Sequence, residues 1–400
     1  MDSLSQIVLG AAVGEAILGK KVGNRAMVWG AIAGTIPDLD VLANAFMTPI
    51  DALAFHRGAT HSFLFCIIGA LVLGWAVHGL YRWPHHKLVG VMAWSILTGG
   101  IGLLIFFLGE ISTSKIIIGI LWFALAGWII FRRYYRPSYD TPIATIKAWQ
   151  WMFFGALITH PILDCFTTYG TQILLPLSDQ RVAFNNISVV DPLYTIPFLI
   201  CLIAAGTIKY TDPRRRWWNN AGLIVSSVYM IFTIFNKVNI NVIFESSMAD
   251  HHIVANRYMT TPTILNNVLW SGIAETDSAY YFGNYSYFDI DDRFKLQKIK
   301  KTEHQFAEPL SNDRTLKILR WFSDDYFLLQ PTTKDTLEYM DLRFGTFRMR
   351  RTDPDEFVFK FNILQQPQGT FILLDQGNSP RNANFGEAFA VLWERILGKL

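Results

Sequence analysis

The first 236 residues alternate between long apolar segments and short polar connections. The apolar segments lie at about 4–19, 26–46, 62–81, 88–108, 116–131, 148–166, 193–209 and 218–236. Apolar runs of this length with few charged residues are typical of helices that cross the hydrocarbon core of a bilayer. The pattern therefore predicts roughly eight membrane helices.

The pattern changes after about residue 240. Short β-branched and aromatic runs, broken by Gly, Asn, Asp and Pro, occur at 279–287, 341–349, 356–362 and 370–375. Such runs are typical of antiparallel strands, whereas 312–322 and 384–398 have helical periodicity. We predict an α-helical membrane bundle over residues 1–236, with some short or broken helices. A β-rich α+β domain over residues 237–400 follows it.

The composition supports this division. Of the 400 residues, 51% are hydrophobic and 17% are charged, which is unusual for a wholly soluble protein. Residues 237–400 hold 19 of the 35 Lys and Arg and 21 of the 32 Asp and Glu. The net charge of +3 forms no basic stripe, so nucleic acid is not an expected partner. The three cysteines have no CxxC spacing, which argues against a structural zinc site or a disulfide framework.

The basic residues of the first 236 positions predict a topology. Thirteen of them lie in every second connection, at 20–25, 82–87, 132–147 and 209–216, whereas the alternate connections carry only Arg57, Lys115 and Arg181. The positive-inside rule places the thirteen in the cytoplasm. The N-terminus and the C-terminal domain are then expected on the extracytoplasmic side of a bacterial inner membrane, in a multi-pass protein.

Three polar clusters interrupt the apolar pattern. Ionisable groups at membrane depth are energetically costly, so their presence indicates a structural or functional role. They are Pro37-Asp38-Leu39-Asp40, His56-Arg57-Gly58-Ala59-Thr60-His61-Ser62 and His160-Pro161-Ile162-Leu163-Asp164. Pro37 is expected to break its helix, and His160 and Asp164 share one helix face.

Helix geometry places these clusters at one level. Asp38 follows Arg25, and His160 follows Lys147, by 13 residues in each case. Both therefore lie about 20 Å from the cytoplasmic boundary, and His61 lies about 31 Å above Arg82. The three clusters are predicted to meet in the outer half of the bundle. Two GxxxG motifs, at Gly10 and Gly30, permit close helix packing nearby.

Imidazole and carboxylate groups without thiolates suit Zn²⁺, Mn²⁺ or Fe²⁺ in an open site that activates water. Arg57 can receive a phosphate oxyanion, and Arg57 and Asp40 are the candidate catalytic residues. Structural alternatives remain: interface histidines at 56 and 61, helix capping by Asp38 and Asp40, and a simple His160–Asp164 hydrogen bond.

Other ionisable residues favour structural roles. Glu15 is expected in an ion pair near Lys20 and Lys21, and Asp191 either caps a helix or joins the site late. The histidines at 78, 85 and 86 belong to the cytoplasmic end, and His251 and His252 are expected at the surface.

The sequence resembles the YdjM-like family of bacterial inner-membrane proteins over roughly residues 1–200. The resemblance rests on Asp2 and Gln6, Gly10-Ala11-Ala12-Val13-Gly14-Glu15 and the three polar clusters, the last continuing to Thr167-Thr168-Tyr169-Gly170-Thr171. The family is described as metal-dependent hydrolases. It is distantly similar to the zinc-dependent phospholipase C and P1-nuclease group, whose HxxxD element His160 and Asp164 match.

The resemblance implies a ligand set of Asp38, His56, His61, His160 and Asp164. One or two divalent ions, with zinc favoured, are expected there. Some members of the family carry a histidine where this chain has Gln6. The function predicted is hydrolysis of a phosphodiester, or another ester, in a membrane lipid. The alternative is a non-enzymatic transporter or envelope scaffold that uses the Asp and His cluster to bind ions or protons.

Overall fold

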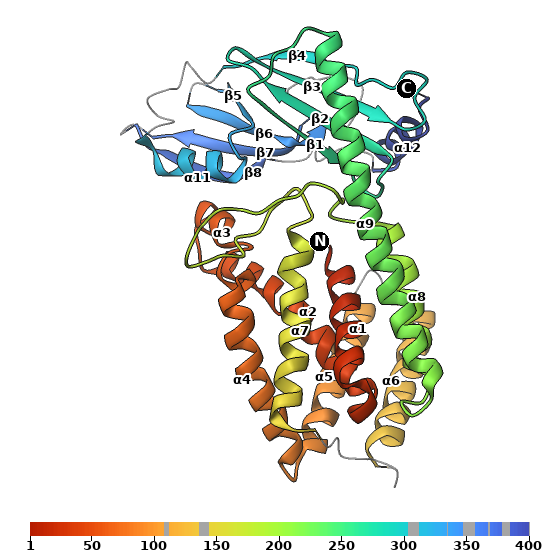
Figure 1. Ribbon diagram of the computed structural model, residues 1–400. Helices are drawn as coiled ribbons and strands as arrows, with labels where there is room; N and C mark the ends of the chain where they lie inside the picture. Colours follow the sequence, from red (N-terminus) through yellow and green to blue (C-terminus); the bar gives the residue numbers. More distant parts are fainter. Residues whose placement is uncertain are drawn as a thin grey trace.

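A computed structural model describes residues 1–107, 112–135, 144–302, 312–333, 335–346, 357–366, 369–377 and 385–399. A helical part and a β-rich part lie one above the other, joined by the long helix α9 (Figure 1). The predicted fold class, helices followed by a β-rich domain, is confirmed at this level.

The helical part contains every predicted apolar segment. Its helices are α1 (Ser3–Val22), α2 (Asn24–Thr35), η1 (Pro37–Ala45), α3 (Pro49–Phe55), η2 (Ala59–His61), α4 (Phe63–Arg82), α5 (His86–Phe107), α6 (Thr113–Tyr134), α7 (Ile146–Asp164), α8 (Pro192–Thr207) and α9 (Pro213–Asp250). Position 108, the end predicted for the fourth segment, lies outside the described residues.

Four of these helices are long and apolar enough to cross a membrane, within the described residues: α4, α5, α6 and α9. A fifth span results if α2 and η1 are counted as one bent segment. Pro37 lies where these two meet at an angle of 47°, as expected for a residue that cannot continue the hydrogen-bond ladder.

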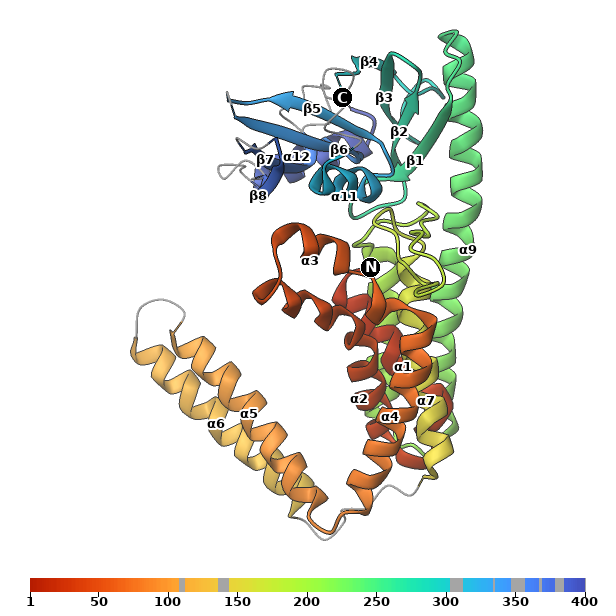
Figure 2. The same cartoon turned by 90° about the vertical axis from the view of Figure 1, so that its left-hand side faces the viewer.

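Helices α1, α2, α4 and α7 share one apolar core that includes Leu18, Ala33, Cys66, Trp149 and Phe153. Helices α8 and α9 pack along α1, whereas α5 and α6 form a hairpin that projects away from the bundle (Figure 2). The hairpin's position was not predicted, because apolar periodicity does not say which neighbour a helix will choose.

The two GxxxG motifs bring α1 and α2 into backbone contact. A Cβ atom at Gly10 would lie 2.4 Å from the carbonyl oxygen of Gly30, and one at Gly34 would lie 2.5 Å from that of Gln6. Only glycine allows this approach, so the predicted close packing is confirmed. It also brings the carbonyl end of α2 against α7.

The C-terminal part holds two four-stranded antiparallel sheets, ordered β1-β2-β3-β4 and β5-β6-β7-β8. The strands are β1 (Arg257–Pro262), β2 (Leu269–Glu275), β3 (Ala279–Ser286), β4 (Gln297–Lys300), β5 (Phe327–Pro331), β6 (Thr336–Thr346), β7 (Phe357–Gln365) and β8 (Phe371–Gly377). The helices α11 (Arg314–Phe322) and α12 (Phe385–Ile396) confirm the two helical predictions. Positions 347–349, 356 and 384, also predicted in these elements, lie outside the described residues.

The predicted division at residue 237 falls inside α9. This helix has 38 residues in all, from Pro213 to Asp250. In its second half, Ile240, Phe244 and Met248 pack on Trp270 and Tyr285 of the first sheet. Its first half lies along α1 and α8, so one continuous helix serves both parts of the chain.

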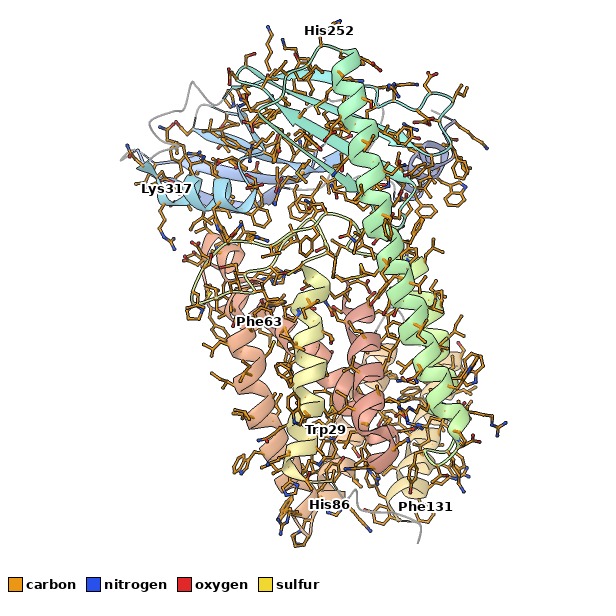
Figure 3. All side chains as sticks on the ribbon, in the orientation of Figure 1. Trp29, Phe63, His86, Phe131, His252 and Lys317 are labelled. Carbon is orange, nitrogen blue, oxygen red and sulfur yellow. The ribbon has the colours of Figure 1, made fainter. Side chains whose placement is uncertain are left out.

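The two ends of the helical part differ in character. The N-terminus lies at the end nearest the β-rich part, which we call the domain end (Figure 1). The connections α1–α2, α4–α5 and α8–α9, which carry most of the predicted basic residues, lie at the opposite or far end. His86 and Phe131 mark the far end, whereas His252 and Lys317 lie in the β-rich part (Figure 3). Arg136, another of the thirteen, lies outside the described residues.

Candidate metal centre

Four predicted ligands meet at the domain end, where α2 turns into η1 and α7 ends. They are Asp38 of η1, His61 of η2, and His160 and Asp164 of α7. The side chains of His61, His160 and Asp164 are fully buried, and that of Asp38 is 19% exposed. The depths calculated from the sequence therefore led to the correct meeting point.

The four ligand atoms form a compact cage. His61 Nε2 and His160 Nε2 lie 3.2 Å apart, and each lies 3.3–3.5 Å from Asp38 Oδ1 and from Asp164 Oδ2. The sixth pair, Asp38 Oδ1 and Asp164 Oδ2, lies within 4.8 Å. A regular tetrahedron with edges of about 3.4 Å, the size of the five shorter edges, has its centre about 2.1 Å from each corner, which is the usual length of a bond from Zn²⁺ to His or Asp. The cage therefore fits one small divalent ion.

The orientation of His160 is fixed by a backbone carbonyl. His160 Nδ1 lies 2.6 Å from the carbonyl oxygen of Gly34. Because a carbonyl only accepts, Nδ1 must carry the hydrogen, and Nε2 of the neutral ring presents its lone pair to the cage. The close approach of α1 and α2 at Gly34 thus reaches the site directly.

The orientation of His61 follows from a similar contact. Its Nδ1 lies 3.1 Å from Thr60 Oγ1, and Thr60 donates a 3.3 Å hydrogen bond to Asp40 Oδ2. A hydroxyl that donates to Asp40 accepts from His61, so Nε2 of this imidazole also faces the cage as an acceptor.

Asp164 divides its two oxygens between support and cage. Oδ1 accepts a 2.9 Å hydrogen bond from Gln6 Nε2 and contacts the amino group of Met1. Oδ2 is buried and has no hydrogen-bond partner among the described residues. Buried carboxylate oxygens normally accept a hydrogen bond, so this one has room for a cation at the cage beside its 3.4 Å ion pair with Arg57 Nε. The donor set and the unmatched oxygen both fit a metal ion.

Asp40 and His56 lie beside the cage rather than in it. Asp40 Oδ1 lies 2.8 Å from His56 Nδ1, and Asp40 Oδ2 accepts a 2.9 Å hydrogen bond from the backbone N–H of Arg57. The ligand set implied by the family resemblance included His56, but the four-residue group does not contain it. The His56 ring instead turns toward Tyr169, with 5.2 Å between ring centroids.

Arg57 adopts an unusual backbone conformation next to the cage. Its φ is 57°, in the left-handed region that non-glycine residues rarely occupy. The buried guanidinium donates a 3.1 Å hydrogen bond to Thr167 Oγ1, and its Nε lies 3.4 Å from Asp164 Oδ2. This Nε has no hydrogen-bond partner among the described residues, so its contact with an anion there is the ion pair with Asp164.

Tyr169 joins this region to the β-rich part, which sequence reasoning missed. The guanidinium carbons of Arg57 and Arg181 lie 4.8 and 4.5 Å from its ring centroid, and Arg181 also stacks against Phe322 of α11. Burial raises the pKa of Tyr169 and lowers that of Arg181 to about 10, so at neutral pH the phenol is neutral and the guanidinium is charged.

The remaining candidates lie elsewhere. Glu15 forms the predicted ion pair, but its partner is Arg215 of α9 rather than Lys20 or Lys21. Asp191 caps α8 by accepting from the N–H groups of Leu193 and Tyr194. His78 contacts the carbonyl of Ala144, and His251 that of Ser247, both away from the cage.

The YdjM inner membrane protein family matches residues 1–109 and 116–240, which is more than half of the chain. The chain belongs to this family. The matched region contains all four cage residues, Asp40, His56 and Arg57. The resemblance seen in the sequence is therefore confirmed, and with it a membrane protein with several apolar helices.

The chain is also similar to a protein of Bacillus subtilis. "Uncharacterized protein YfhP" of Bacillus subtilis (strain 168) is 25% identical over 206 residues, which are 50% of this chain and 59% of that protein. The chain thus spans about three fifths of its length. No solved structure matches the chain. The similarity to phospholipase C and P1 nuclease remains a prediction from the HxxxD element.

Proposed function

We propose that this YdjM family protein is a metal-dependent hydrolase, acting on a phosphodiester or another ester of a membrane lipid. The observation that carries the proposal is the cage itself: one ligand atom from each of Asp38, His61, His160 and Asp164 lies within 4.8 Å of the other three. A divalent ion, with zinc favoured by the tetrahedral size, would supply Lewis acidity that activates water at neutral pH.

The surrounding side chains suit this chemistry. Asp38 is the one partly exposed ligand, so substrate and water reach the cage from its side. Arg57, 3.4 Å from Asp164, is placed to hold a phosphate oxygen, and Thr167 fixes the direction of its guanidinium. Asp40 orients His61 through Thr60 and anchors the backbone of Arg57. The buried cage excludes bulk water, which strengthens each of these interactions.

Two measurements on detergent-purified protein test the proposal. Elemental analysis should find about one zinc per wild-type chain, and mass spectrometry should detect hydrolysis products from vesicles of phosphatidylglycerol and phosphatidylethanolamine. Asp164→Asn should lose both. Asp191→Asn is the matched control, because it also changes a buried aspartate but keeps a side chain that caps α8. Equal metal content and activity in the two variants would sink the proposal.

A second function is favoured by the short distances between imidazole and carboxylate. Each cage nitrogen lies within 3.5 Å of two carboxylate oxygens, so protons could occupy the same positions as a metal. The protein would then carry ions or protons without hydrolysis. Proton-driven uptake by reconstituted vesicles, lost in Asp38→Asn and insensitive to zinc chelators, would favour this function over the first.

The orientation in the membrane is part of the proposal. The basic connections lie at the far end, so the positive-inside rule assigns the β-rich domain and the cage to the extracytoplasmic side. An alkaline phosphatase reporter fused after Leu400 should be active. An inactive reporter, with a cytoplasmic reporter active at the same position, would reverse the orientation.

A further inference from the structure

An apolar crevice separates the η1–α3 segment from the second sheet. It has a volume of about 460 Å³. Its walls are Val41, Met47 and Leu53 on the helical side, and Phe359, Phe361 and Leu373 on β7 and β8. Both parts of the chain are therefore needed to form it, although all four cage residues belong to the first part.

The inner end of the crevice reaches the candidate metal centre. His56 and Tyr169 line this end. His56 hydrogen-bonds Asp40 at 2.8 Å, and the Tyr169 ring lies 4.8 Å from the Arg57 guanidinium carbon. A molecule in the crevice thus has its polar end near Arg57 and Asp38, and its other end between η1 and the sheet.

The outer side of the crevice has an apolar surface. On η1, Leu39 and Leu42 are 50% and 63% exposed, and Phe46, directly after η1, is 91% exposed. Three exposed apolar side chains this close together are typical of a segment that lies in a membrane interface. A segment of this kind next to the crevice would bring lipid chains close to its walls.

The neighbouring α3 is held against the β-rich domain. Ile50 belongs to the apolar core that includes Leu319 and Phe361, and Asp51 forms a 2.5 Å ion pair with Arg314. These contacts fix the spacing between η1–α3 and the sheet, so the crevice is a built feature of the fold.

We infer that the crevice binds one acyl chain of a glycerophospholipid whose head group lies at the four-residue cage. The inference rests on the proposed function and names its substrate class. At about 30 Å³ for each methylene, comparable with a water molecule, 460 Å³ holds about fifteen methylenes, which is one fatty acyl chain. The role of the C-terminal domain is then to supply one wall of the chain-binding site.

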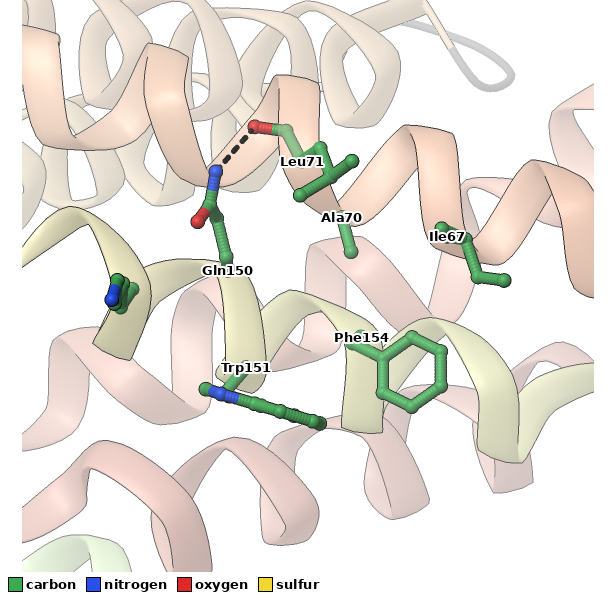
Figure 4. Close-up of a pocket in the computed structure, with 7 residues that line it drawn as sticks. Ile67, Ala70, Leu71, Gln150, Trp151 and Phe154 are labelled. Atoms are coloured by element: carbon green, nitrogen blue, oxygen red, sulfur yellow. Dashed lines mark hydrogen bonds between the residues drawn. The ribbon is translucent and has the colours of Figure 1, made fainter.

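A groove elsewhere on the helical part provides an internal comparison. It lies between α4 and α7, is lined by Ile67, Leu71, Trp151 and Phe154, and has Lys147 and Gln150 at one end (Figure 4). Its volume is about 510 Å³, but none of its lining residues belongs to the cage or to the residues described above as supporting it. A lipid there would be an ordinary neighbour of a membrane helix, which separates general lipid contact from the inferred site.

Photocrosslinking tests the inference without requiring hydrolysis. The probe is phosphatidylglycerol with a diazirine near the end of one acyl chain, in phosphatidylethanolamine vesicles containing the full-length protein. We expect adducts on the peptide that contains Phe359 and Phe361. Val41→Trp and Met47→Trp should each lower these adducts about tenfold by filling the mouth of the crevice. Leu42→Trp is the matched control, because Leu42 is the next residue on η1 and does not line the crevice.

The outcomes separate this inference from the proposed function. Adducts confined to the α4–α7 groove and the α5–α6 hairpin, or equal adducts on β7 for the Val41 and Leu42 variants, would overturn the inference. Strand adducts that persist in a protein without zinc or hydrolysis would support the acyl-chain site and count against the hydrolase. Hydrolysis without adducts on β7 would support the hydrolase and count against the acyl-chain site.

Discussion

The helical part buries two clusters of charged groups, and they differ in how their donors and acceptors match. At the far end, Glu15 accepts from Arg215 Nε at 2.6 Å and from Arg215 Nη2 at 2.5 Å, while Arg215 Nη1 donates to Asn24 and to the carbonyl of Ile208. At the domain end, four acceptors of the cage face one another. Among the described residues, Glu15 and Arg215 match each other's hydrogen-bonding groups, whereas Asp164 Oδ2 at the cage has no hydrogen-bond partner.

The difference teaches how to recognise a functional cluster among buried charges. Burial is similar, since Glu15, Arg215, His61 and Asp164 are all less than a tenth exposed. A matched pair stabilises the fold and leaves nothing for a ligand. An excess of one kind of hydrogen-bonding group is unfavourable unless a ligand completes it, so it marks a binding site.

The largest expected effect concerns a cage ligand. His160→Ala should weaken zinc binding by at least about 1,000-fold, or about 4 kcal/mol, because it removes one of four ligands. Competition with a chromophoric chelator measures the affinity. His78→Ala, which changes a histidine at the far end, should bind zinc like the wild type. If the two variants bind zinc equally, the contrast between the ends has no functional meaning.

The second effect concerns the matched pair. Glu15→Gln should lower the free energy of unfolding by about 3–4 kcal/mol, because it leaves Arg215 buried without its counter-charge. Thermal unfolding in detergent, followed by circular dichroism, measures this loss. Replacing both residues by methionine should restore most of the stability. The zinc content of the folded variants should not change, and a loss of zinc would show that the two clusters are coupled.

A third effect separates ligands from supporting residues. Asp40→Asn should weaken zinc binding by about 10- to 100-fold, because Asp40 acts on His61 through Thr60 and does not face the cage. Asp51→Asn, an exposed change on α3, is the control. A loss as large as that of His160→Ala would instead place Asp40 among the ligands.

The smallest effect links backbone packing to the cage. Gly34→Ala should cost about 1–2 kcal/mol of stability, because its Cβ would lie 2.5 Å from the Gln6 carbonyl oxygen. The shift of the Gly34 carbonyl should also reduce zinc affinity several-fold through His160. Gly119→Ala has open space around the new methyl group and should be neutral or slightly stabilising. Unchanged stability in Gly34→Ala would contradict the close packing of α1 and α2.

The sequence by itself determined the division of the chain and the level of the site. The apolar segments and the uneven distribution of charge were sufficient to predict a helical part and a β-rich part. Helices and strands have different side-chain periods, and these periods can be recognised in the sequence. Asp38 and His160 each lie 13 residues after a basic residue directly before an apolar segment. Because a helix rises by a constant amount for each residue, this equal spacing predicted that the two side chains lie at one depth. The family motifs then pointed to the same residues.

Only the tertiary structure decided which side chains face the cage. Asp38 and Asp40 are two residues apart in the same short helix, η1. Asp38 is a cage ligand and Asp40 supports the cage, and no periodicity in the sequence distinguishes these two roles. The choice of His61 over His56 depends on Asp40 and Tyr169, and that of His160 Nε2 depends on the Gly34 carbonyl. The crevice is formed by residues that are about 300 positions apart in the sequence. Such contacts are set by the directions of side chains across packed elements, and the spacing of residues along one element does not record them.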